Sequence, residues 1–204
     1  MSENESKPHY VITISREFGS LGRPVAKRTA EILGIYFMDR DIVEMTARRM
    51  GLPVSEIGNQ EETARNKYIY MKFPLGVGPQ PIEDEIFEAQ SNIILDQAKK
   101  EDCIIVGRCA EYVLRDHVRK MNVYIHAPYE WRLRRCIDQL QMDGMTAGKM
   151  IHDVDLARDR YRRRYEKNIS GPFACRDLIL DTSVFGVEKC AQIIAASARI
   201  MFDL

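Results

Sequence analysis

Arginine residues follow several short apolar runs of this sequence, and arginine is the side chain best suited to holding phosphate groups. Arg40 and Arg108 come directly after two such runs, while Arg16 and Arg23 flank a glycine-containing turn after a third. A guanidinium group is planar and always charged, and it donates hydrogen bonds to two phosphate oxygens at once. If the runs are parallel strands of one sheet, their carboxyl ends share one edge and the arginines converge there. The pattern therefore predicts a site for a polyphosphate or for phosphoryl transfer.

The turn at residues 16–23 contains Gly19 and Gly22, which would let its backbone curl tightly. Its N–H groups, and the N-terminus of the helix predicted after it, would then face an anion. The Walker A pattern GxxxxGK[ST] is absent, since no GK[ST] tripeptide occurs in the chain. When the Walker A pattern is aligned through residues 25–27, which follow the turn, its lysine position falls on Gly22 and its Ser/Thr position on Arg23. For this segment alone, a tight turn without a ligand is the alternative interpretation.

Short β-branched or apolar runs alternate with helical patterns along the chain. The predicted strands are residues 10–14, 35–38, 103–106, 122–125 and 178–180. The predicted helices are residues 24–33, 41–50, 86–98, 129–165 and 187–201. The alternation indicates an α/β fold, a doubly wound five-stranded parallel sheet. Residues 51–81 are polar and rich in glycine and proline, which predicts an excursion from the core.

The composition excludes several classes of protein. The 204 residues are enough for one sizeable core, and 30 basic residues balance 30 acidic ones, which argues against nucleic acid as a partner. With no apolar run of about 18 residues and no export signal, we expect a cytoplasmic protein without a membrane partner. The five cysteines lack CxxC spacing and are expected to be reduced thiols, and the histidines lack metal-ligand spacing, so no metal site built from protein residues is predicted. A homo-oligomer is compatible with the sequence.

Four segments together carry a resemblance to a known family. They are SREFGSLGR at 15–23, FMDR at 37–40, IIVGRCA at 104–110 and LILDTS at 178–183. These segments resemble motifs of the cytidylate kinase-like family, which is related to bacterial cytidylate kinases and more distantly to adenylate kinases. The resemblance implies the sheet order 2-3-1-4-5 in a single domain, residues 10–204, after a loose tail at 1–9. It also implies a nucleotide-monophosphate-binding insertion at about 40–97 and an arginine-rich lid within about 138–167.

The resemblance further implies a reaction, the transfer of the γ-phosphoryl group of ATP to CMP or dCMP with Mg²⁺. The expected donor-side residues are Arg16, Gly19, Ser20, Gly22 and Arg132, with Ser20 the nearest hydroxyl for the Mg²⁺ and Arg132 near the donor base. The expected acceptor-side residues are Asp39, Arg40 and Arg108. Arg23 would replace the missing lysine, with Arg16 as the alternative. Arg158 and Arg162, spaced i,i+4 on one helical face, would contact the transferring phosphoryl group with Arg108.

The first turn departs from the family pattern. Gly22 and Arg23 occupy the Walker lysine and Ser/Thr positions, and Leu21 stands where a glycine is expected. A guanidinium and an ammonium group are not equivalent, so a nucleotide-binding sensor or regulator without phosphoryl transfer is the alternative function. An NAD-type oxidoreductase is disfavoured because the turn lacks GxGxxG.

Overall fold

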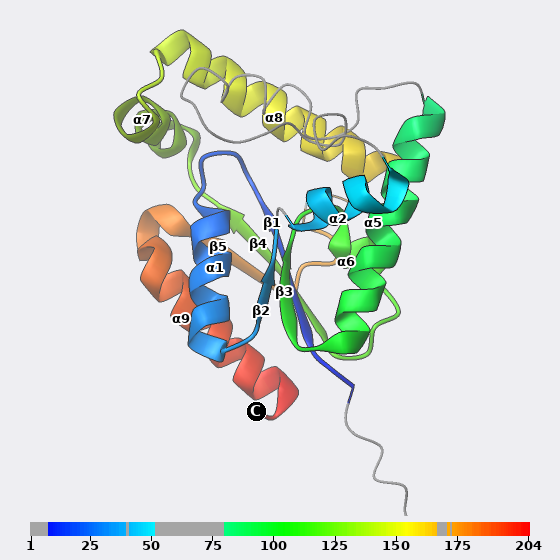
Figure 1. Cartoon of the computed structure of the whole chain (residues 1–204). Helices are drawn as coiled ribbons and strands as arrows, with labels where there is room; N and C mark the ends of the chain where they lie inside the picture. The colour runs from blue at the N-terminus through cyan, green and yellow to red at the C-terminus, as the bar shows by residue number, and fades with distance from the viewer. Residues whose placement is uncertain (1–7, 40, 52–79, 167–170, 172) are drawn as a thin grey trace, which may run out of the picture.

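The computed structural model describes residues 8–39, 41–51, 80–166, 171 and 173–204 (Figure 1). Its strands are β1 (Val11–Arg16), β2 (Tyr36–Met38), β3 (Cys103–Val106), β4 (Lys120–His126) and β5 (Leu178–Asp181). They form one parallel sheet in the order β2-β3-β1-β4-β5. The predicted fold class and strand order are therefore confirmed.

Helices cover both faces of the sheet and its carboxyl edge (Figure 1). They are α1 (Gly22–Leu33), α2 (Asp41–Met50), α5 (Gln80–Lys100), α6 (Ala110–Val113), α7 (Tyr129–Leu140), α8 (Gly144–Tyr165) and α9 (Thr182–Phe202). On the face of α1 and α9, Ile14 packs with Val25 and Ile194, and on the face of α2, α5 and α6, Ile105 packs with Ile94. Because both faces are covered, the central strands are continuous apolar runs.

The predicted helix at 129–165 is wrong as a single element, because the structure divides it into α7 and α8. Gln141 ends α7 in the left-handed conformation with φ 53°. Asp143 then begins α8 as its N-cap, accepting a hydrogen bond from the N–H of Thr146 at 3.0 Å. A small core that includes Cys136 and Ile151 joins the two helices. The result places α8 across the carboxyl ends of the strands (Figure 1).

Helix α1 begins at a strained residue. Its N-cap, Leu21, has φ 63° and ψ 16°, the left-handed conformation that favours glycine. The expectation of a glycine at this position thus has a physical basis in the backbone of the turn. Gly34 ends the helix with φ 66°, and its N–H donates to the carbonyl of Ala30, so the predicted stop signal is confirmed.

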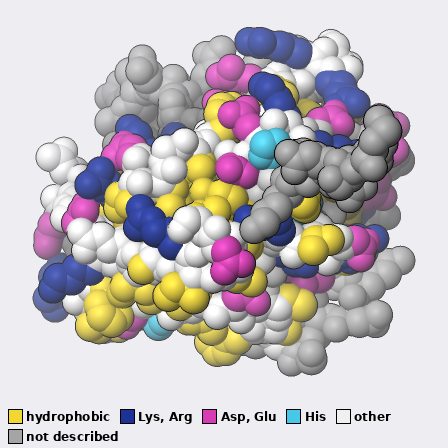
Figure 2. Space-filling model, turned by 90° about the horizontal axis from the view of Figure 1, so that it is seen from below, with side chains coloured by type: hydrophobic (Ala, Val, Ile, Leu, Met, Phe, Trp, Pro, Cys, Tyr) yellow, Lys and Arg dark blue, Asp and Glu magenta, His cyan; other side chains and the backbone are white. Residues whose placement is uncertain are grey.

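The surface carries mixed charge. Figure 2, which looks toward the amino ends of the strands, shows basic and acidic side chains interspersed over that face with hydrophobic ones between them. This distribution agrees with the zero net charge of the chain. Within the described ranges, no helix combines the length and apolar character that crossing a membrane requires. The five cysteines are free thiols, as predicted.

Candidate phosphate-binding site

A cavity of about 220 Å³ lies between the carboxyl ends of the strands and helix α8. Residues 15–17 line it from the end of β1, Asp39 from β2 and residues 106–109 from β3, while Arg158 and Arg162 line it from α8. Residues at the carboxyl ends of β1, β2 and β3 thus line one cavity, and its use as a site stays a prediction. The strand order reverses between β1 and β3, since the chain leaves β1 toward one edge of the sheet and β3 toward the other. Ligands of doubly wound sheets bind at such a switch point.

The guanidinium of Arg16 lies in this cavity between two glycines. A Cβ atom added to Gly107 would overlap Nη1 of Arg16, and one added to Gly22 would lie 2.5 Å from the Cβ of Arg16. Within the described part of the chain, the guanidinium makes neither a hydrogen bond nor an ion pair. Burial lowers the pKa of Arg16, against the opposing effect of the Asp39 carboxylate, and the charge of Arg108 lowers it further. Arg16 is only partly buried, so water can solvate its guanidinium, but an anion in the cavity would stabilise this charge further.

Arg158 brings a second cation to the same place. Its Nη1 donates to the backbone carbonyl of Arg16 at 3.1 Å and lies 3.8 Å from Asp155 Oδ1, a contact between residues three apart on α8. Burial, followed by the positive charge of Arg16, lowers the pKa of Arg158 to about 9. The positive charges of the two guanidinium groups repel each other. An anion in the cavity would offset this repulsion and would be stabilised by both groups.

Arg108 sits on a turn with unusual backbone angles. Gly107, Arg108 and Cys109 have φ of 77°, 57° and 52°, so two residues with side chains adopt the left-handed conformation. Such a conformation costs about 1–2 kcal/mol per residue that has a Cβ, and it concentrates at functional sites. The charge of Arg108 lowers the pKa of both Arg16 and Arg158. The turn thus places a third cation within electrostatic range of the other two.

The remaining predicted arginines are engaged differently. Arg23 is 45% exposed, does not line the cavity, and forms an ion pair with Asp39, whose Oδ2 lies 2.5 Å from Arg23 Nε. Arg162 pairs with Glu166 at 2.8 Å and still lines the cavity. Arg40 lies outside the described residues. The cation that enters the site from the first turn is therefore Arg16 and not Arg23.

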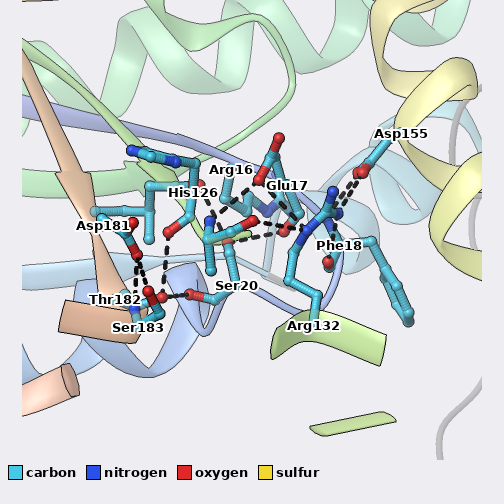
Figure 3. A network of polar contacts seen from close by, with 12 residues as sticks. Arg16, Glu17, Phe18, Ser20, His126, Arg132, Asp155, Asp181, Thr182 and Ser183 are labelled. Atoms are coloured by element: carbon cyan, nitrogen blue, oxygen red, sulfur yellow. Dashed lines mark hydrogen bonds and ion pairs between the residues drawn. The ribbon is translucent and has the colours of Figure 1, made fainter. Parts of the chain in front are cut away.

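Ser20 fixes the first turn through hydrogen bonds (Figure 3). Its side chain is fully buried, and its Oγ lies 2.9 Å from the carbonyl oxygen of Glu17 and 3.1 Å from that of Ile125. Thr182 Oγ1 donates to the carbonyl of Ser20 at 2.8 Å, which ties the turn to the start of α9. Gly19 has φ 79°, and a Cβ atom added to it would lie 3.3 Å from the Cβ of Arg132. The turn is thus shaped by internal hydrogen bonds before any ligand binds.

Arg132 joins the turn to helix α8 (Figure 3). Its side chain is 8% exposed, and it donates to the carbonyls of Ala127 at 3.0 Å and Phe18 at 2.9 Å and to Asp155 Oδ2 at 2.6 Å. Asp155 also accepts a hydrogen bond from the N–H of Phe18 at 2.6 Å, and Glu17 lies 3.4 Å from Arg132 Nε. Arg132 therefore links the first turn to helix α8, and it does not line the cavity.

The sequence profile of the cytidylate kinase-like family matches residues 11–184, which include all five strands and the cavity. The protein belongs to the cytidylate kinase-like family. Its fold is that of kinases that transfer phosphoryl groups. None of the curated proteins compared with the chain matches it.

Solved structures share the fold of this family member at low sequence identity. An uncharacterized protein from Eubacterium ventriosum has a TM-score of 0.68 and 24% identity, covering 93% of this chain and 98% of its own. Shikimate kinase from Acinetobacter baumannii, solved with shikimate, has a TM-score of 0.52 and 16% identity, covering 98% of this chain and 95% of its own. A Bacillus subtilis protein solved with phosphorylated GDP has a TM-score of 0.52 and 13% identity, covering 95% and 98%. These likenesses concern the fold alone.

Membership of a kinase family implies Mg²⁺, whose preferred protein ligands are oxygens. Asp39 fits this ion, because its carboxylate lines the cavity and its Oδ2 already faces the cation of Arg23. Ser20 does not fit, since its hydroxyl is fully buried and does not line the cavity. The ion would supply neutralisation of phosphate charge, with Asp39 holding it or one of its waters.

Glu111 and Arg176 line the cavity although nothing in the family motifs marks them. Their side chains are 4% and 1% exposed and form an ion pair at 2.9 Å. The one signal in the sequence is position, since Glu111 follows the turn after β3 and Arg176 precedes β5. That signal is weak, because a charged residue beside a strand is most often on the surface.

Proposed function

We propose that this protein transfers the γ-phosphoryl group of ATP to a nucleoside monophosphate, with CMP and dCMP as the first acceptors to test. The observation that carries the proposal is the partly buried guanidinium of Arg16, which has no acceptor among the described residues and lies beside Arg158. Such an arrangement leaves unbalanced positive charge at the switch point of the sheet. A polyphosphate supplies the missing negative charge, and the kinase fold of the family supports this choice of anion.

In the proposed reaction, an oxygen of the acceptor phosphate bonds to the γ-phosphorus of ATP while the bond to the β–γ bridging oxygen breaks and ADP leaves. The amino end of α1 and the amides of the turn would hold the donor phosphates. Arg16 would supply the cation that the absent Walker lysine provides elsewhere. Arg158 and Arg162 would reach the transferring group from α8, while Arg108 and Arg40 would hold the acceptor phosphate.

Positioning and charge neutralisation are sufficient for this chemistry. Phosphoryl transfer proceeds through a loose transition state whose charge lies mainly on the transferred oxygens, so fixed cations stabilise it without covalent participation. Asp39 would orient Arg23 or a water bound to the metal ion. Asp155 connects α8 to the first turn, which supports a role for the arginines of α8 at the strand ends.

A coupled assay tests the proposal with ATP, Mg²⁺ and a panel of CMP, dCMP, UMP, AMP and shikimate. We expect ADP release with at least one pyrimidine monophosphate, and loss of that activity in Arg16→Met. Arg28→Met is the matched control, because Arg28 is an arginine of α1 that pairs on the surface with Glu188. Tight ATP binding without turnover on any acceptor would instead identify a sensor. Absence of nucleotide binding would refute the site itself.

A further inference from the structure

The carboxylate of Asp155 is held at the first turn by the kind of groups that bind phosphate (Figure 3). Its Oδ1 accepts a hydrogen bond from the N–H of Phe18 at 2.6 Å, and its Oδ2 accepts one from Arg132 Nη1 at 2.6 Å. Arg158 Nη1 lies 3.8 Å from Oδ1. Backbone N–H groups of tight turns, together with arginine side chains, are common ligands of phosphate groups in proteins. The two carboxylate oxygens therefore stand where two phosphate oxygens would fit.

This carboxylate can be reached from the cavity. The side chain of Asp155 is 27% exposed, and it lines the cavity together with Glu17 and Tyr124. A ligand in the cavity would thus compete with Asp155 for the N–H of Phe18 without unfolding the surrounding core. Burial, followed by the charges of Glu17 and Asp155, raises the pKa of Tyr124 to about 12. Because both carboxylates act on one hydroxyl group, they are close enough to repel each other, which makes Asp155 easier to displace.

We propose that Asp155 is an internal competitor of the donor phosphates, which fills an anion subsite at the N–H of Phe18 until a phosphate group displaces it. The inference rests on the proposed function only in placing a phosphate at the first turn. On displacement, the N–H of Phe18 exchanges a carboxylate acceptor for a phosphate oxygen. Arg158 loses its contact with Asp155 at the same time and pairs with the ligand instead. The affinity for phosphate in the wild type is therefore reduced by the free energy of the contacts that Asp155 makes.

Displacement of Asp155 would loosen the amino end of α8 and leave its carboxyl end fixed. Arg162, near the carboxyl end, donates a hydrogen bond to the carbonyl of Ala174 at 3.2 Å. Tyr165 stacks on Phe87 of α5, with the ring centroids 3.8 Å apart. Neither contact involves Asp155, so the helix would pivot about its carboxyl end when a phosphate binds.

Titration calorimetry of the full chain with pyrophosphate tests the inference. Asp155→Asn should bind pyrophosphate at least about tenfold more tightly than the wild type, because a neutral amide holds the N–H of Phe18 less strongly than a carboxylate does. Glu17→Gln removes the same charge from the same cavity, but Glu17 accepts from the N–H of Ala127 and not from that of Phe18. Its gain in affinity should stay below about threefold. An unchanged or weaker affinity in folded Asp155→Asn overturns the inference.

Hydrogen exchange in the wild type decides the matter if Asp155→Asn does not fold. Pyrophosphate should speed backbone exchange at the amino end of α8 and slow it in α1, whose amino end would hold the ligand. A ligand that leaves Asp155 in place would slow exchange in both helices, and that result overturns the inference.

The outcomes separate this inference from the proposed function. Tighter pyrophosphate binding by Asp155→Asn, without turnover of any acceptor by the wild type, keeps the inference and removes the kinase. Turnover by the wild type, with the same pyrophosphate affinity in folded Asp155→Asn, keeps the kinase and overturns the inference. If neither protein binds pyrophosphate, both are overturned.

Discussion

The guanidinium of Arg16 lies directly against the α-carbon of Gly107, so the end of β1 and the turn after β3 share one space. Any Cβ at position 107 would overlap Nη1 of Arg16, so every other residue type requires this guanidinium to move. Gly107 also has φ 77°, which adds a conformational requirement to the steric one. This contact holds the cation at the switch point of the sheet, where the donor phosphates are proposed to bind.

Gly107→Ala should displace Arg16. We expect ATP affinity to fall at least about tenfold, since a charge-assisted hydrogen bond contributes about 1.5–3 kcal/mol, with a matching drop in the free energy of unfolding. Gly34→Ala is the control, because Gly34 has φ 66° with nothing within 4 Å of its added Cβ. That variant should lose about 1 kcal/mol of stability through backbone strain alone and keep its ATP affinity. Equal ATP affinities in the two variants would contradict the role assigned to Arg16.

Arg16→Met should separate stability from function. The apo protein should unfold at the same temperature or a higher one, because burial disfavours the charge that the substitution removes. Affinity for ATP or pyrophosphate should fall by about ten- to a hundredfold, and Arg16→Lys should recover part of the loss. Thermal melting with and without pyrophosphate measures both effects, with Arg28→Met as the surface control. A less stable apo protein that binds pyrophosphate normally would show that Arg16 is structural.

Leu21→Gly should stabilise the protein, since Leu21 adopts a left-handed conformation at the start of α1. Leu21→Ala keeps a Cβ in that conformation and removes most of the same side chain. The difference in the free energy of unfolding between the two variants therefore measures the cost of the left-handed backbone for a residue that has a Cβ. We expect the glycine variant to exceed the alanine variant by about 1 kcal/mol in the free energy of unfolding, measured by urea titration. If the alanine variant were equally stable, the turn would not be strained at this residue.

Asp155→Asn should loosen helix α8 from the first turn. Asp155 accepts from the N–H of Phe18 through one carboxylate oxygen and from Arg132 through the other, both at 2.6 Å. The amide of asparagine has one acceptor oxygen, so it cannot satisfy both donors in this way. We expect a loss of about 2–3 kcal/mol in stability and a lower kcat. Asp153→Asn is the control on the same helix, because Asp153 is exposed and does not line the cavity. Similar destabilisation by both variants would argue against a specific connection through Asp155.

The strands and their ends could be predicted from the sequence with good accuracy. The run at Cys103–Val106 was predicted with its observed bounds, because four buried apolar residues before a glycine leave little choice of structure. The helices were less accurate where a polar cap decides the boundary. Asp143 starts a new helix inside what the periodicity indicated as one, and a single side-chain hydrogen bond to Thr146 makes that difference.

The sequence by itself determined the order of elements and the position of arginines after the strands, since local hydrophobic patterns set both. Only the tertiary structure decided which arginine remains available to a ligand. Arg23 finds a carboxylate at Asp39, Arg132 finds one at Asp155, and Arg176 finds one at Glu111, while Arg16 finds none among the described residues. The physical reason is that ion pairing depends on which carboxylate lies within a few ångströms in space, and each of these partners is distant along the chain.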